Sequence, residues 1–416
     1  MNNDFENTRG AETNPTPAEN PDNSNINSGS ADFQPPPEGF DGARAGGCEP
    51  RFQGGFQPVC SAAPQGAYYG AAGNAAGNYS APFSVYNDPY YGKKLLERRE
   101  LRRVTRTAVI PALILMAAFS YFTRFLVDIL LAAGVKRESI VSLFSDPAFS
   151  NVYSVAISCL FFSVPFILAA KVSGFYISDL TAYGKSEKGT AFPMFLVGVA
   201  FCGFANIMSG IAGNFFSSLG FNYSVPDSDV PQGIAGIAVS VLAVSVEPAL
   251  MEEFAMRGIT YGLFRRWGNG FAIIVSSALF GLMHGNFEQI PFAFLVGLVL
   301  GVSRAKTGSM WVGCAIHGFN NLIAVAFDYL PSSINLNLAY GIYLMLCMLL
   351  GFLGLLLMKG DFFVIDSEPA ETDLTAKERY GAVFSHPLTI IFAVMCVFES
   401  LMYWGPIADF INSLTA

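Results

Sequence analysis

The sequence predicts an all-α fold, a polytopic transmembrane helical bundle of about eight to nine spans, preceded by a disordered N-terminal tail. The first observation is the composition, because the 416-residue chain is 52% hydrophobic and only 13% charged, with a mean hydropathy of +0.42. Such values are typical of membrane proteins rather than of soluble ones. The second observation is that apolar residues gather in segments close to the ~20 residues that a helix needs to cross a bilayer.

The first 92 residues form a separate acidic region that is rich in Asn, Gly and Pro. Residues 1–92 contain ten acidic and three basic residues, with no helical or strand periodicity. A segment of this composition cannot bury enough apolar surface to offset the entropy of ordering it, so we predict that it is disordered. Its polar start also predicts the absence of a cleavable signal peptide. The rest of the chain is nearly neutral, and we therefore expect no nucleic-acid partner.

A basic juxtamembrane segment, residues 93–107, leads directly into the membrane domain, residues 108–414. Basic residues recur in every second connection of that domain, whereas the other connections carry almost none apart from Lys136 and Arg137. This positive-inside pattern predicts a cytoplasmic N-terminus. The basic segment would then contact anionic membrane lipids. We expect an integral, multi-pass protein of a bacterial plasma membrane.

Nine apolar segments are candidates for the spans. The sixth is short for a span and is expected to be re-entrant or tilted. If all nine cross the bilayer, the C-terminus lies on the outer side. The nine segments are roughly 108–133, 149–170, 191–219, 234–264, 270–287, 290–303, 310–330, 335–358 and 388–412.

Three charged residues, Glu252, Glu253 and Arg257, lie inside the fourth apolar segment, where each charge costs about 2.5–3.5 kcal/mol on insertion scales. Glu253 and Arg257 are four residues apart and share a helix face, so we expect them to form an ion pair. Glu252 points about 100° away, because a helix has about 3.6 residues per turn. Glu252 is thus left free to act, the alternative being an ion pair that only fixes helix packing.

Two of the three histidines lie at a depth similar to that of Glu252. Measured from the basic connections at about 1.5 Å per residue, Glu252 lies ~20 Å and His284 ~22 Å deep. On the same scale His317 lies ~12 Å and Asn321 ~18 Å deep, and these two share a helix face. Polar groups at such depth tend to face a bundle interior or a wet cavity, so their meeting in one layer predicts a functional site.

Hydrolysis is the chemistry that this set of groups can perform. A carboxylate and an imidazole can bind and deprotonate one water. A second imidazole and a carboxamide can donate to the oxyanion that forms on the attacked carbonyl. Alternatively, two histidines and a glutamate can hold a catalytic zinc ion. The HExxH spacing of common zinc proteases is absent.

Three motifs in order, EExxxRG at 252–258, FxxxH at 280–284 and HxxxN at 317–321, resemble those of the CAAX-processing and bacteriocin-processing (CPBP) intramembrane proteases. This family includes the type II CAAX prenyl endopeptidase and the bacterial Abi immunity proteins. The resemblance covers about residues 190–330, which we take as the catalytic core. It implies an intramembrane endopeptidase that hydrolyses peptide bonds of membrane-associated protein or peptide substrates.

The resemblance also implies a role for each motif residue. Glu252 and His284 would activate the water, whereas His317 and Asn321 would form the oxyanion site. The supporting residues would be Glu253, Arg257 and Phe280. We favour a site without metal, because no carboxylate is evident as a second ligand shell for a zinc-bound histidine. If zinc binds, its ligands would be Glu252, His284 and His317.

Two other functions fit parts of the same sequence. Intramembrane acids and histidines also serve as proton or ion carriers, as in an ion-coupled transporter. No internal repeat of the kind that many carriers show is found in the sequence. A catalytically silent membrane scaffold, with a tail that recruits partners, is the other alternative.

Overall fold

The computed structural model describes residues 89–181, 183–184, 186, 189–221, 230–359, 362 and 372–407. Nearly all of the predicted disordered tail, residues 1–92, lies outside this part of the chain. Within it, seven helices are long and apolar enough to cross a membrane, or eight if the bent pair α13 and α14 forms one span. These helices confirm the predicted fold class, and among the described residues only an isolated bridge joins Phe221 and Trp404 in β geometry.

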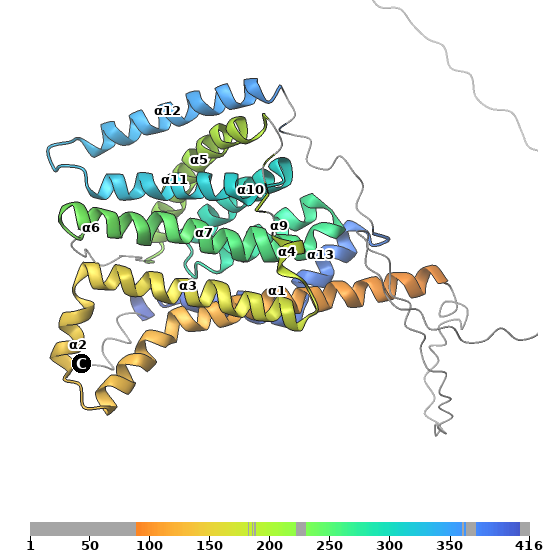
Figure 1. The fold of residues 1–416 in the computed structure, drawn as a ribbon, viewed down its shortest axis with the longest axis horizontal. Helices are drawn as coiled ribbons and strands as arrows, with labels where there is room; N and C mark the ends of the chain where they lie inside the picture. Colours follow the sequence, from red (N-terminus) through yellow and green to blue (C-terminus); the bar gives the residue numbers. More distant parts are fainter. Residues whose placement is uncertain are drawn as a thin grey trace, which may run out of the picture. The chain divides into compact units, whose positions relative to one another are not determined.

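The helices follow one another in a simple order along the chain (Figure 1). They are α1 (Pro89–Ala132), α2 (Arg137–Phe144), α3 (Pro147–Val172), α4 (Ile177–Leu180), α5 (Ala191–Ser218), α6 (Gly233–Ser240), η2 (Val241–Val246), α7 (Glu247–Glu253), η3 (Phe254–Thr260), α8 (Tyr261–Phe264), η4 (Arg265–Trp267), α9 (Asn269–Leu282), α10 (Gln289–Thr307), α11 (Met310–Asp328), α12 (Leu336–Leu357), α13 (Ala376–Phe384) and α14 (Pro387–Leu401). The segments from α6 to η4 form one continuous rod, Gly233–Trp267.

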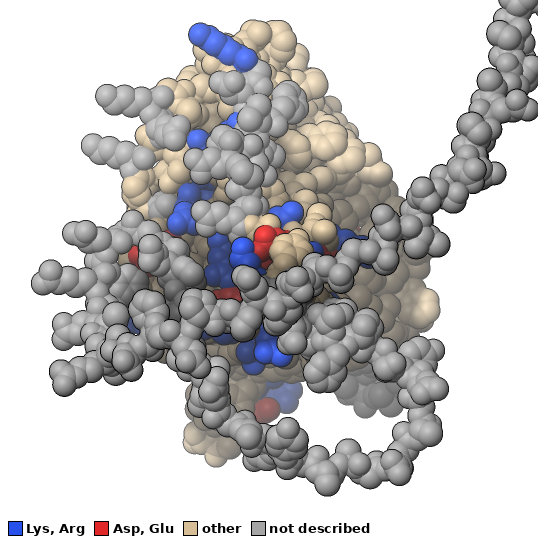
Figure 2. Space-filling model, turned by 90° about the vertical axis from the view of Figure 1, so that its right-hand side faces the viewer, with Lys and Arg blue, Asp and Glu red and all other residues tan. Residues whose placement is uncertain are grey.

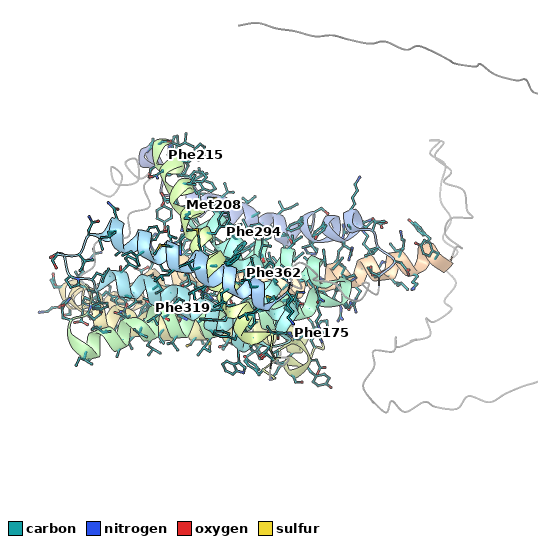
Figure 3. All side chains as sticks on the ribbon, turned by 90° about the horizontal axis from the view of Figure 1, so that it is seen from above. Phe175, Met208, Phe215, Phe294, Phe319 and Phe362 are labelled. Carbon is teal, nitrogen blue, oxygen red and sulfur yellow. The ribbon has the colours of Figure 1, made fainter. Side chains whose placement is uncertain are left out.

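The central rod lies between two groups of helices. Figure 1 shows α12 at one edge of the bundle, packed against α5, and α1 with α3 at the opposite edge. The rod packs against α11 on one side and α3 on the other. Seen from above, Phe319 of α11 lies within the bundle, whereas Phe215 lies near the projecting end of α5 (Figure 3).

One prediction about the short span is wrong. The sixth apolar segment is a full helix, α10, with 19 residues, whereas the fifth is the short one, α9, with 14. Helix α9 ends at Leu282 because the chain turns there, and Gly285 adopts a positive φ of 63°. His284 therefore lies in a turn rather than on a span. The ninth segment is helical from Pro387 to Leu401, and its predicted end beyond 407 lies outside the described residues.

The rod is not a regular α-helix around the glutamates. Val244 O would accept the N–H of residue 248 in an α-helix, but Pro248 has no N–H. The chain widens here into the π-helical stretch η2, and a second π-helical stretch, η3, follows Glu253. Such stretches are frequent at functional sites. The two of them flank α7, the short segment that carries Glu252 and Glu253.

Glycines allow α11 to lie close to α7. A Cβ atom placed on Gly313 would lie 3.1 Å from Glu253 Oε2, and one on Gly318 would lie 3.4 Å from Ala249 Cβ. Ser245 Oγ also donates to Gly318 O at 2.7 Å. This close packing fixes the position of His317, which lies between the two glycines on α11.

Basic side chains gather at the end of the bundle where α1 begins (Figure 2). That end is held together by contacts between distant segments, because Trp267 Nε1 donates to Glu97 Oε1 at 3.0 Å and Arg266 pairs with Glu100 at 3.6 Å. Lys93 also pairs with Asp373 at 2.7 Å. Exposed basic residues of these segments include Lys93, Arg98, Arg99, Arg265, Arg266 and Lys377.

Candidate active site

One small cavity brings the predicted site residues together. Glu252 lies on α7, His317 and Asn321 lie on α11, and His284 lies in the turn after α9. The cavity has a volume of about 190 Å³. It is lined by Glu252, Phe280, His284, Gln289, Phe292, Ala293, Val296, His317, Asn320 and Asn321. We call it the inner cavity, and its walls contain residues from all three sequence motifs.

Glu253 and Arg257 form the expected ion pair. Arg257 Nη1 donates to Glu253 Oε1 at 2.9 Å, and both side chains are fully buried. Arg257 Cζ lies 4.3 Å from the centroid of the Phe280 ring, which covers the cation. Phe280 also meets the imidazoles of His284 and His317 edge-on, with ring centroids 5.0 and 6.1 Å apart. Phe280 thus connects the ion pair to both imidazoles.

His317 lies between the two glutamates, a contact that the sequence did not predict. Its Nδ1 is 3.2 Å from Glu253 Oε1, and its Nε2 is 3.8 Å from Glu252 Oε2. A carboxylate only accepts, so Nδ1 carries the proton and donates it to Glu253. In the neutral imidazole, Nε2 is then an acceptor, and it faces Glu252. His317 is thus the imidazole that the structure places within 4 Å of Glu252, and the expected pairing of Glu252 with His284 stays a prediction.

His284 is held by its own turn. Its Nδ1 lies 2.8 Å from the carbonyl oxygen of Phe280, which fixes a proton on Nδ1, so that Nε2 is an acceptor in the neutral ring. Asn286 Nδ2 donates to His284 O at 3.3 Å, and Gln289 N donates to Asn286 Oδ1 at 2.8 Å. The structure records no ion pair between His284 and a described acidic residue. His284 lines the inner cavity from the turn after α9.

A chain of carboxamides crosses from α5 to the rod. Asn206 Nδ2 donates to Asn320 Oδ1 at 3.2 Å, and Asn320 Nδ2 donates to Asn321 Oδ1 at 3.1 Å. Asn321 Nδ2 then donates to Val244 O at 3.0 Å, the carbonyl that Pro248 leaves without its α-helical donor. The amide nitrogens of Asn320 and Asn321 each carry a second N–H for which no acceptor is recorded in the described part of the chain.

Sequence reasoning missed Asn206 and Asn320 because neither lies at a motif position. The signal that was present is the pair Asn320-Asn321 itself, together with a proline four residues after Val244. Asn206 could be found only once α5 was placed against α11.

The geometry does not assemble the alternative zinc set. Among the residues that the structure describes, no three His, Cys, Asp or Glu side chains are placed to hold a metal ion. The Nδ1 atoms of His284 and His317 are already occupied by Phe280 O and Glu253. A zinc ion on Glu252, His284 and His317 would have to be held by both Nε2 atoms, and metal content stays a prediction for experiment.

Comparison with known proteins gives one family for this region. Residues 234–323 match the family model described as "Type II CAAX prenyl endopeptidase Rce1-like". This stretch of the chain is therefore similar to the Rce1-like family. The match contains all three motifs and lies inside the expected core of about 190–330, so the resemblance read from the motifs is confirmed. Asn206, which starts the carboxamide chain, lies outside the Rce1-like match.

One curated relative supports the same assignment. "Putative membrane peptidase YdiL" of Bacillus subtilis (strain 168) is 24% identical over 99 residues, which are 24% of this chain and 41% of the relative. The chain thus covers less than half of that relative's length. No solved structure matches the chain significantly.

Proposed function

We propose that this chain is an intramembrane endopeptidase that hydrolyses peptide bonds of membrane-associated protein or peptide substrates. The observation that carries the proposal is the place of Glu252, beside His317 on the wall of a cavity between membrane helices. The Rce1-like match over 234–323 supports it, because that family is described as an endopeptidase.

Glu252 and His317 are proposed to activate the attacking water. Glu252 Oε2 and His317 Nε2 are 3.8 Å apart, too far for a direct hydrogen bond, and a water between them could donate to both. Glu252 takes the proton as the water oxygen attacks the carbonyl carbon. It then gives that proton to the leaving nitrogen as the C–N bond breaks, which regenerates the carboxylate.

The donors to the oxyanion are proposed to be the second N–H groups of Asn320 and Asn321. Their carboxamides are already fixed by hydrogen bonds, and preorganised donors stabilise developing charge without reorganisation. Neutral His284 presents an acceptor, so we assign it to orienting the water or receiving a proton rather than to donating to the oxyanion.

The orientation of the chain follows from its charge. We propose that the basic end in Figure 2 faces the cytoplasm of a bacterial cell and contacts anionic lipids, in keeping with the positive-inside rule. The N-terminus would then be cytoplasmic.

The test is cleavage by the purified chain of a peptide library and of membrane-anchored reporters. Glu252→Gln keeps the size of the side chain and removes the base, so cleavage should be lost while the protein remains folded. Glu247→Gln is the matched control, because Glu247 is also a buried glutamate of α7 but contacts Cys159 of α3 at 3.7 Å. Near wild-type turnover by Glu252→Gln would contradict the proposal.

Metal content is tested on the same preparation. No step above uses a metal, so chelator-washed protein should keep its activity and contain no stoichiometric zinc by elemental analysis. One zinc per chain, lost together with activity and restored with it, would replace this mechanism by a zinc mechanism on Glu252, His284 and His317.

A further inference from the structure

A second and larger cavity lies on the other side of His284. Its volume is about 600 Å³, and we call it the side chamber. Its walls include Ser120 and Arg124 of α1, the turn at His284 and Gly285, and Glu399 of α14. Glu399 packs directly against that turn, since a Cβ atom placed on Gly285 would lie 3.5 Å from Glu399 Cβ. None of these residues except His284 belongs to the inner cavity.

Two charged side chains of the side chamber have no hydrogen-bond or ion-pair partner among the described residues. Neither Arg124 nor Glu399 makes a side-chain hydrogen bond or ion pair with another described residue. Arg124 lies eight residues before the end of α1 at Ala132, which is about 12 Å inside the helix. Charged side chains within spans pair with one another or face a water-filled cavity, because lipid does not solvate them. These two are unpaired, so the side chamber is expected to hold water.

The side chamber also has the size and the place of a water reservoir for the site. At about 30 Å³ per molecule it holds on the order of ten waters or more. His284 lines both cavities, and its side chain is partly exposed. Helix α9 begins beside the basic end at Asn269 and rises about 20 Å to Leu282, so the side chamber lies toward the other end of the bundle.

We propose that the side chamber is a hydrated passage that brings water to Glu252 past His284, from the end of the bundle opposite the basic residues. Arg124 and Glu399 keep the passage wet, and substrate occupies the inner cavity. The use of this water for peptide hydrolysis rests on the proposed function, whereas the passage itself does not.

Hydration is tested by labelling single cysteines with a permanently charged, membrane-impermeant methanethiosulfonate, in a chain whose seven native cysteines are replaced by alanine. The reagent attacks thiolate, which forms in water and not in lipid, so Ser120→Cys should react at least about tenfold faster than Phe125→Cys. Phe125 is a matched control, because it lies on the same helix nearer its end, is 61% exposed and does not line the side chamber. Equal rates would overturn the proposal.

The same Ser120→Cys chain tests the role of Arg124 and Glu399 and the side of the membrane from which water enters. Arg124→Leu combined with Glu399→Leu should slow its labelling, because the side chamber then lacks the groups that hold water. In sealed vesicles of each orientation, reaction should occur only from the side opposite the basic end. Unchanged labelling in the double variant, or reaction from the basic side alone, would contradict the assignment.

The connection between the side chamber and the inner cavity is tested by labelling His284→Cys, a measurement that does not require catalytic activity. Its labelling should slow about tenfold when Ser120→Trp fills the side chamber, less with Ser120→Leu, and not with Ser120→Ala. Unfolding would accelerate labelling, so a slower reaction is not a folding defect. If the Leu and Trp variants leave the rate unchanged, water reaches His284 by another route and the proposal is wrong.

Turnover then links the passage to hydrolysis. Ser120→Trp, with no other substitution, should lower kcat and leave KM nearly unchanged, because water and not substrate is restricted. Unchanged kcat in a chain that cleaves peptides would show that this water is not the reactant. If the wild-type chain cleaves nothing, the proposed function fails, and the labelling rates still decide whether the passage exists.

Discussion

At the scale of single residues, the arrangement with most consequence is the hydrogen bond between His317 and Glu253. Glu253 serves two partners, because the same Oε1 accepts from Arg257 and from His317. The ion pair therefore sets the tautomer of the imidazole that faces Glu252. Sequence spacing assigns Glu253 only to a structural ion pair with Arg257. In the structure Glu253 also contacts His317, the imidazole next to Glu252.

Substitution of His317 should cost more activity than substitution of Asn321. Asn321→Ala removes one oxyanion donor, and such losses typically lower the rate by about 10²–10³. His317→Ala removes the proposed partner of Glu252 and should approach Glu252→Gln in severity. Rates from kcat/KM on one peptide decide the order. Equal losses at both positions would return His317 to the oxyanion role that the motifs suggested.

Breaking the buried ion pair should destabilise the chain. Glu253→Ala and Arg257→Ala each leave one unpaired charge, and truncating one partner of a buried pair costs about 3–5 kcal/mol. The double variant should recover part of this loss, because the pair already leaves Glu253 Oε2 and Arg257 Nε and Nη2 without partners among the described residues. Thermal unfolding in detergent measures all three, and purely additive losses would argue against the coupling.

At the scale of elements, the important feature is the irregular rod around α7. Pro248 prevents a regular helix, and Val244 O accepts from Asn321 of another helix instead. The backbone defect thereby orients a side chain of the proposed site. The same defect sets the angle at which Glu252 leaves the rod.

Restoring a backbone N–H at residue 248 tests whether the backbone defect orients Asn321. Pro248→Ala supplies an N–H to Val244 O and should raise helix stability, since a proline within a helix costs about 3 kcal/mol. Asn321 then loses its acceptor, so kcat should fall about tenfold while the melting temperature stays or rises. In the Asn321→Ala background, Pro248→Ala should have no further effect on kcat. Additive effects would show that Pro248 acts by another route.

The elements also show what sequence could and could not predict. Hydropathy located all nine apolar segments, because a segment that lies in lipid needs apolar side chains along its whole length, and these are visible in the sequence. It did not find that α9 ends before His284, since that depends on the backbone angle at Gly285. Motif spacing brought Glu252, His284, His317 and Asn321 into one site. It could not assign His317 to Glu252, because the rotation of one helix against another is set by packing at Gly313 and Gly318.

At the scale of the whole molecule, the two ends of the bundle differ in chemistry. One end carries the basic residues and the contacts between α1, η4 and the segment before α13. The side chamber lies toward the other end. In the proposed orientation, the lipid-contacting basic end and the proposed water supply lie toward opposite faces of the membrane.

The N-terminal region should be dispensable for chemistry on a small substrate. Deletion of residues 2–80 removes a segment with no catalytic residue set and no packing pattern in its sequence. Cleavage of a short peptide by the truncated chain should therefore match that of the full chain. A truncated chain that inserts normally but cannot cleave would show that this region takes part in catalysis.

The two π-helical stretches have a consequence for the evolution of this segment and for the alignment of related sequences. A π-helical stretch holds one residue more than the α-helix that it replaces, so η2 and η3 each correspond to a one-residue insertion on either side of Glu247–Glu253. Ancestral loss of either insertion would have turned Glu252 by about 100° relative to the chain beyond it. Relatives that keep a cavity-facing glutamate are therefore expected to keep both inserted residues, so that an alignment shows no single-residue gap at 241–246, at 254–260 or in the segment between.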